Sequence, residues 1–156
     1  SDIFHDFPYG LNEVTIQKKD SSMITVHTYI NDEFLNSYWT DGLIISTPTG
    51  STAYAMSVGG PIIEPDCNNF IIAPIASHNL SVRPILIPDD VEITLKMDGR
   101  ADKFLVTVDN RTATLNRLTE IKLKKADFSI RMLKLHTNTF YKTIRNKLNW
   151  GVDKRN

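Results

Sequence analysis

Residues 41–61 read DGLIISTPTGSTAYAMSVGGP, and the stretch changes character near its middle. It opens with the apolar run LII at 43–45, which is typical of a buried strand. Small and hydroxylated side chains follow, and Pro48 and Gly50 among them are turn residues. We therefore expect a strand that leads into a polar turn.

A short helix is predicted directly after this turn, at residues 51–57. Thr49 or Ser51 is the expected N-cap, because Ser and Thr side chains accept hydrogen bonds from the first N–H groups of a helix. The run Gly59-Gly60-Pro61 ends the helix. Free N–H groups at a helix start, with hydroxyls beside them, suit a phosphate or a sugar as ligand.

The polar turn has two interpretations. In one, its small residues let a nucleotide-like ligand approach the backbone. In the other, which composition alone favours, the hydroxyls only cap the helix and complete the turn. A Walker-type phosphate loop is excluded, because no lysine follows Gly50.

Length and composition predict one domain, spanning residues 1–156, with a hydrophobic core. The 18 basic and 18 acidic residues balance, which argues against a nucleic-acid partner. The single cysteine, Cys67, excludes an internal disulfide and fits a reducing compartment. The sequence contains no apolar run of transmembrane length and no signal-peptide pattern. We therefore expect a cytoplasmic protein without membrane contacts.

Short apolar runs at close spacing predict a mainly β fold. The predicted strands are residues 14–17, 23–30, 34–39, 43–45, 70–73, 85–87, 91–97, 104–109, 112–115, 121–124 and 128–135. Asn31-Asp32 predicts a hairpin turn, Asp98-Gly99 a second turn, and Pro74 the end of a strand. Apolar residues at helical spacing predict one C-terminal helix at 137–148. Together these elements predict a multi-stranded, β-sandwich-like domain with one short helix and one C-terminal helix.

Candidate chemistry outside the polar turn rests on three acidic or amide residues. Asn12-Glu13 stands where a loop becomes a strand, and could hold sugar hydroxyls or be an exposed polar pair. Asp41 could accept hydrogen bonds from a ligand or bind nearby backbone N–H groups. The four histidines are scattered, and no His, Cys, Asp or Glu set has metal-ligand spacing. We therefore predict no metal site within the chain.

Residues 41–61 also resemble the C-terminal domain of NAD kinases, in a nearly continuous match of more than twenty residues. Further matches follow in the same spacing. They are Leu11-Asn12-Glu13, Pro74-Ile75, His78-Asn79-Leu80-Ser81 and Arg83-Pro84. The resemblance is strongest from Asn12 to Pro88 and weaker after Val91.

This resemblance implies transfer of a phosphoryl group from ATP to the 2′-hydroxyl of the adenosine ribose of NAD, which yields NADP. Mg²⁺ is expected to accompany ATP as the cofactor, and NAD is the substrate. The family has two domains, an N-terminal α/β domain with a Gly-Gly-Asp-Gly loop and a mainly β C-terminal domain that binds NAD. Family members commonly form homodimers or homotetramers.

Matching positions carry the family's NAD contacts onto this sequence. Asn12 and Glu13 would contact the ribose region of NAD. Asp41 would bind nicotinamide or adenine, in some cases from a neighbouring subunit, and Ala76 would pack on a base. Arg111 stands where many members have Gln. The residues expected to line the pocket are Thr52, Ala53, Tyr54, Ala55, Met56 and Ser57.

The family's Gly-Gly-Asp-Gly loop is absent from the 156 residues. We therefore expect the chain to be the C-terminal domain of a longer enzyme, to hold no catalytic residue and to have little kinase activity by itself. Two other functions remain, a nucleotide-binding or oligomerisation module and a lipid kinase of the diacylglycerol or sphingosine type. Asn12-Glu13 together with the STPTGSTAY run favours the NAD-specific branch over the lipid kinases.

Overall fold

The computed structural model describes residues 4–133 and 139–150. They fall into two compact units, of which the first ends at Ala126 and the second begins at Asp127. The first unit contains every described strand, and the second contains the helix α2 (Phe140–Leu148). Among the described residues, no helix has the length and apolar character needed to cross a membrane.

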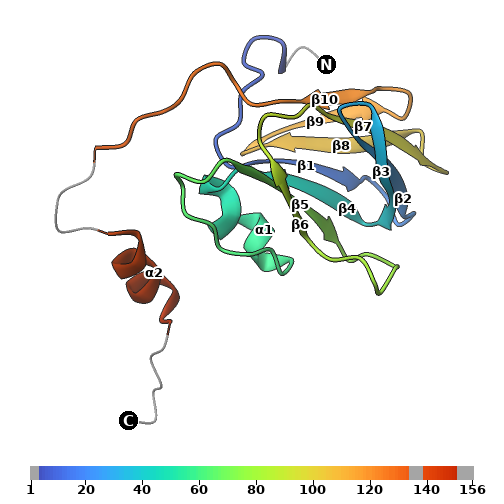
Figure 1. The fold of residues 1–156 in the computed structure, drawn as a ribbon. Helices are drawn as coiled ribbons and strands as arrows, with labels where there is room; N and C mark the ends of the chain where they lie inside the picture. Colours follow the sequence, from blue (N-terminus) through green and yellow to red (C-terminus); the bar gives the residue numbers. More distant parts are fainter. Residues whose placement is uncertain (1–3, 134–138, 151–156) are drawn as a thin grey trace. The chain divides into compact units, whose positions relative to one another are not determined.

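Two antiparallel sheets make up the first unit (Figure 1). The larger sheet has the strand order β6-β5-β4-β1-β8-β9. Its strands are β1 (Glu13–Lys18), β4 (Gly42–Ser46), β5 (Asn69–Ile75), β6 (Ile85–Pro88), β8 (Lys103–Val108) and β9 (Arg111–Asn116). The smaller sheet has the order β10-β7-β2-β3. Its strands are β2 (Ile24–Ile30), β3 (Glu33–Thr40), β7 (Ile93–Gly99) and β10 (Ile121–Leu123). The predicted sandwich-like class is confirmed.

The main hydrophobic core contains inward-facing residues of both sheets. Ile16 and Leu43 of the larger sheet and Val26 and Leu95 of the smaller one are all fully buried in it. Burying a side chain of this size contributes roughly 1.5–3 kcal/mol. The alternating pattern of β1, β2 and β7 therefore sets which face of each sheet meets the other.

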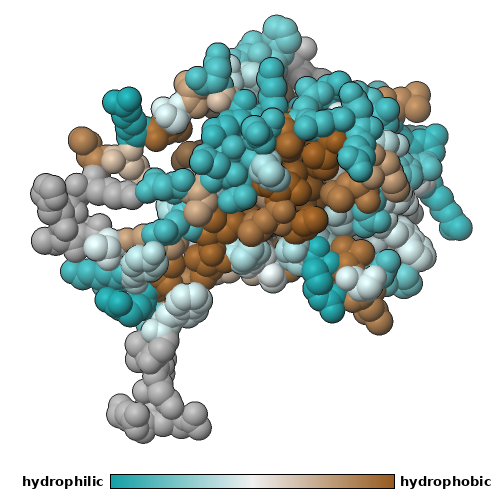
Figure 2. Space-filling view, viewed as in Figure 1, coloured by the Kyte–Doolittle hydropathy of each residue, from teal (hydrophilic) through white to brown (hydrophobic). Residues whose placement is uncertain are grey.

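A second apolar cluster covers the other face of the larger sheet. Ile44 and Ile71 of that face pack with Ala55 of α1 (Tyr54–Ser57) and with Ile63. Strand β4 is consequently buried on both faces, which explains why its sequence is continuously apolar rather than alternating. Figure 2 shows hydrophobic residues gathered at the centre of the face that carries β4, β5 and β6 in Figure 1.

The hairpin and most strands agree with the sequence patterns, but Pro74 does not end a strand. It lies inside β5, opposite Leu43. The carbonyl of the next residue, Ile75, accepts the Asp41 N–H, so the backbone of Pro74 points to the opposite side. On that side of β5, the pairing with β6 ends at Ile72. The N–H group that proline lacks would therefore have had no partner in β6.

Three further predictions need correction. Asp98-Gly99 is no turn, because both residues extend β7 and pair with β2, and β7 begins at Ile93 rather than at residue 91. Residues 128–133 form no strand, and 134–135 lie outside the described residues. The C-terminal helix begins at Phe140, with Thr139 as its N-cap. Residues 137–138 of the predicted helix lie outside the described residues.

The turn Asn31-Asp32 is confirmed. It joins β2 to β3, and its two residues have φ of 48° and 65°. Asn and Asp tolerate this left-handed conformation better than other residues with side chains, and such turns match the twist of a hairpin.

Candidate functional site

Two segments distant in the sequence meet at the end of β1 and β4. The carbonyl of Asn12 accepts the N–H of Thr47 at 2.9 Å and the hydroxyl of Ser46 at 3.2 Å. The Thr47 hydroxyl donates to the carbonyl of Leu11 at 2.7 Å. Residues 11–13 and 46–50 therefore form one rigid unit, called the Asn12 junction below.

Gly50 permits the close approach of the two segments. A Cβ atom at this position would lie 2.2 Å from the carbonyl oxygen of Asn12 and 2.6 Å from the Ser46 hydroxyl. These distances are below any van der Waals contact, and a backbone atom cannot turn away as a side chain can. Glycine is therefore required here by space.

The hydroxyls of the polar turn fall into two groups. Ser46 and Thr47 bond within the Asn12 junction, and Thr47 also accepts the Gly50 N–H at 3.2 Å. Ser51 is fully buried and bonds both the N–H and the carbonyl of Ile63. These three hydroxyls are structural. Thr52, in contrast, is exposed, and its hydroxyl has no hydrogen bond to any described residue.

Neither predicted N-cap is used. The turn continues as a 3₁₀ helix, η2 (Thr49–Thr52), and α1 starts only at Tyr54. Ala53, with φ −97° and ψ −131°, separates the two helices, and neither has a side-chain cap. Ser51 cannot cap, because its hydroxyl is occupied by Ile63.

This division of the hydroxyls predicts unequal effects on stability. Ser51→Ala should lower the free energy of unfolding by about 1–3 kcal/mol, because it leaves the Ile63 backbone groups buried without partners. Thr52→Ala should change it by less than about 0.5 kcal/mol, as expected for an exposed side chain without a partner. Urea denaturation of both variants measures the difference. Equal effects would contradict the structural role of Ser51.

Glu13 brings a poorly solvated carboxyl group to the Asn12 junction. Burial raises its pKa above the usual carboxyl range. The backbone N–H of Tyr54, which hydrogen-bonds to the carboxylate, lowers the pKa, and the nearby Asp109 carboxylate raises it. Its Oε2 atom is buried and has no hydrogen-bond partner among the described residues. This oxygen has unused acceptor capacity, but it is closed to solvent, so a ligand hydroxyl reaches it only when the Glu13 side chain turns outward.

Tyr54 extends the site along β1. Its phenol oxygen accepts a hydrogen bond from the Gln17 amide at 3.2 Å, and its side chain is 36% exposed. The neighbouring Ala55 is fully buried in the second apolar cluster, whereas Ala53 and Met56 are half-buried and Ser57 is exposed. Of the predicted pocket residues, Ala55 therefore has a packing role.

Asp41 and Ala76 lie at the other end of the same strands. Glu13 pairs with Ser46 and Gln17 with Gly42, so the two ends are four residues, or about 13 Å, apart. Asp41 forms an ion pair with Lys18 at 2.7 Å. The structure therefore separates the predicted residues into two clusters, one at each end of β1 and β4.

The Asp41 end carries two further features. Ala76 is exposed and adopts a positive φ of 47°. Close by, the N–H of His78 donates to the carbonyl of Trp39, and the two rings lie 4.4 Å apart.

Arg111 is occupied by the N-terminal loop. Its guanidinium donates to the carbonyls of Phe7 and Tyr9 and lies 4.8 Å above the Phe7 ring. The preceding Asp109 accepts the N–H groups of Leu11, Asn12 and Glu13. Sequence reasoning placed Asp109 only at the end of the predicted strand 104–109, whereas β8 ends at Val108. A bond across 96 or more positions leaves no local pattern by which it could be found.

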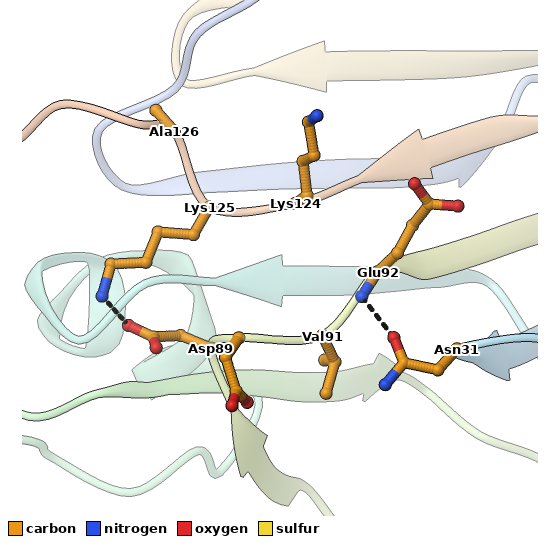
Figure 3. Close-up of a pocket in the computed structure, with 8 residues that line it drawn as sticks. Asn31, Asp89, Val91, Glu92, Lys124, Lys125 and Ala126 are labelled. Carbon is orange, nitrogen blue, oxygen red and sulfur yellow. Dashed lines mark hydrogen bonds and ion pairs between the residues drawn. The ribbon is translucent and has the colours of Figure 1, made fainter.

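Other groups in the described residues do not form a competing site. No three His, Cys, Asp or Glu side chains in this part of the chain lie close enough together to hold a metal ion. A cavity of about 400 Å³ lies between the β2–β3 turn, the loop before β7 and the residues after β10 (Figure 3). Asp89 and Lys125 in its wall already pair at 2.6 Å, and none of the predicted site residues lines it.

Comparison with known proteins identifies similar chains. Residues 11–135 match the ATP-NAD kinase C-terminal domain family. The NAD kinase of Flavobacterium johnsoniae is 54% identical over 157 residues, which cover 100% of this chain and 53% of the relative. The NAD kinase of Cytophaga hutchinsonii is 50% identical over 155 residues, covering 99% and 53%. The chain thus spans about half the length of the curated relatives it matches.

Two solved structures have the same fold. Yeast NADH kinase complexed with NADH matches with a TM-score of 0.83 at 24% identity, over 92% of this chain and 45% of that chain. An NAD kinase from Archaeoglobus fulgidus in complex with ATP matches with a TM-score of 0.68 at 28% identity, over 76% and 46%. The mainly β arrangement is therefore one that these two solved structures share.

Proposed function

The chain belongs to the ATP-NAD kinase C-terminal domain family, and on this premise we propose that it binds the NAD substrate of an NAD kinase. The whole enzyme would transfer the terminal phosphoryl group of ATP to the 2′-hydroxyl of the adenosine ribose of NAD and release NADP. The observation that carries this proposal is the unused acceptor capacity of Glu13, whose buried Oε2 has no protein donor among the described residues and would meet a ligand once the side chain turns outward. A ribose hydroxyl is a donor of the right kind.

The proposed role of this chain is to position the acceptor. Phosphoryl transfer depends mainly on alignment and on charge stabilisation, so holding the ribose rigidly is a direct contribution to rate. Glu13 would accept from the ribose, and Asn12 beside it would donate or accept through its amide. Mg²⁺, bound with ATP, would neutralise developing charge on the phosphates. The described residues offer it no cluster of carboxylates.

An elongated ligand fits the two clusters. Asn12 and Glu13 lie at one end of β1 and β4, and Asp41 and Ala76 at the other. A dinucleotide has two bases joined by a pyrophosphate, so we assign the ribose to the first cluster and a base to the second. A second copy of the chain in a dimer or tetramer could supply the Asp41 cluster instead. An N-terminal α/β domain is the remaining proposed partner.

Substitution of Tyr54 and of Asn12 tests this proposal in the natural full-length protein. Tyr54→Ala or Asn12→Ala should weaken NAD binding by about tenfold, equivalent to one lost polar contact of about 1.4 kcal/mol, and should affect ATP binding less. Titration calorimetry with each nucleotide measures both. Phe34→Ala removes an exposed aromatic side chain from the other sheet and is the matched control.

Thermal unfolding of each variant separates loss of binding from loss of fold. If ATP affinity fell and NAD affinity did not, the pocket would be assigned to the wrong nucleotide.

A further inference from the structure

The turn between β8 and β9 holds the segment that leads into β1. The carboxylate of Asp109 accepts the N–H of Leu11 and of Asn12, each at 2.8 Å, and the N–H of Glu13 at 3.1 Å. The Asp109 N–H donates to the carbonyl of Glu13 at 3.0 Å. Four hydrogen bonds thus connect one residue to three consecutive ones.

The conformation of Asp109 suits this task. Its φ is 52°, a left-handed value that Asp and Asn adopt more readily than other residues with side chains. The carboxylate lies against Gly10, where an added Cβ would stand 3.7 Å from the Oδ1 atom of Asp109 and 3.0 Å from Val108. A carboxylate offers only acceptors, so both of its oxygens match the row of N–H donors.

Arg111 holds the same segment further upstream. Its planar guanidinium bonds the carbonyls of Phe7 and Tyr9 while Asp109 bonds the N–H groups that follow. The two charged residues of one turn therefore bind opposite kinds of backbone group, which fixes both the path and the rotation of residues 7–13.

We propose that Asp109 is a positioning residue of the dinucleotide site, which orients the side chains of Asn12 and Glu13 without touching the ligand. This inference rests on the proposed function. The three N–H groups set the rotation of the backbone at residues 11–13, and this rotation determines where the amide of Asn12 and the carboxyl of Glu13 point. Three of the four bonds depend on the carboxylate, so its loss leaves only the backbone bond from the Asp109 N–H to the Glu13 carbonyl.

Asp109→Asn is the decisive variant. It keeps the size of the side chain and the tolerance for positive φ, but replaces one acceptor oxygen by an NH₂ group that faces N–H donors. In the natural full-length protein, we expect the KM for NAD to rise about fivefold, while the KM for ATP and kcat stay within about twofold. Hydrogen exchange at the amides of Leu11, Asn12 and Glu13 should accelerate about tenfold.

Asp102→Asn is the matched control, because Asp102 is exposed and its carboxylate bonds no described residue. It should leave all of these quantities unchanged. If Asp109→Asn does not fold, Asp109→Glu, which moves both acceptors outward by one methylene, takes its place in the same measurements.

An unchanged KM for NAD in a folded Asp109 variant would overturn the inference, and so would unchanged exchange at the three amides. A wild-type protein that neither binds nor uses NAD would instead overturn the proposed function, and with it the assignment to a dinucleotide site. Amide exchange needs no ligand, so it still decides whether Asp109 holds the turn.

Discussion

Glu13→Gln should weaken NAD binding by roughly 10- to 100-fold, since a hydrogen bond to a charged group contributes about 1.5–3 kcal/mol. The substitution keeps the shape of the side chain. It removes the charge, however, and can place an amide NH₂ group, which is a donor, opposite the ribose hydroxyl whose hydrogen bond Glu13 would accept. Titration of the natural full-length protein with NAD measures the loss, and Glu64→Gln, at an exposed position, is the control.

The same variant should behave differently without ligand. The folded-state pKa of Glu13 is raised, chiefly by burial, so the folded protein binds the Glu13 proton more tightly than the unfolded chain does. This contribution to stability is fully present below the unfolded-state pKa and is lost as pH rises through the higher folded-state pKa. Wild type should therefore lose stability as the pH rises above the usual carboxyl range, whereas Glu13→Gln lacks this component.

Unfolding midpoints of the two unliganded proteins between pH 4 and 8 compare these slopes. Parallel curves would contradict the burial of Glu13 in the unliganded protein. Tight NAD binding by Glu13→Gln would contradict the assignment of Glu13 to the NAD site. A variant that gains stability and loses binding is the outcome expected of a group buried for function.

Gly50→Ala should have the largest effect on the folded protein, with a loss of about 3 kcal/mol, the upper end of the usual range for overpacking. The new Cβ would meet the carbonyl oxygen of Asn12 at 2.2 Å and its carbon at 2.6 Å. Neither atom belongs to a flexible side chain, so residues 11–13 must move away from the polar turn. NAD binding should therefore fall together with stability.

Gly59→Ala is the comparison for Gly50→Ala. Gly59 has φ +84° and no atom within 4 Å of the added Cβ, so this change strains the backbone by about 1–2 kcal/mol without touching Asn12. Urea denaturation measures both losses, and NAD titration separates them, because only Gly50→Ala should impair binding. Normal NAD affinity in folded Gly50→Ala would contradict the role given to the Asn12 junction.

Local patterns predicted most of the strands for a simple physical reason. Side chains alternate across a strand, so a sheet with one face in the core leaves an alternating sequence, as in β2, and a strand buried on both faces leaves a continuous run, as in β4. The prediction that Pro74 ends a strand was wrong, because the effect of a proline depends on which strand pairs with each side of β5. That choice is made by the sheet and not by the residue.

The sequence proposed residues for the candidate site but not their arrangement. The Asn12-Glu13 pair and the STPTGSTAY run identify the family, yet nothing in them separates the structural Ser51 from the exposed Thr52. The resemblance also puts Arg111 among the ligand contacts, and only the structure reveals that its guanidinium bonds the carbonyls of Phe7 and Tyr9.

By itself, the sequence determined most of the strands, the hairpin at Asn31-Asp32 and the family, because these depend on periodicity, turn chemistry and a contiguous motif. The tertiary structure alone decided which hydroxyls are structural and that Pro74 lies inside β5. It alone also decided that the Asp109 carboxylate bonds the backbone of Asn12 and Glu13. Each of these depends on hydrogen bonds or pairings between segments distant in the sequence. Such contacts form only when the sheet brings the segments together, so no local pattern records them.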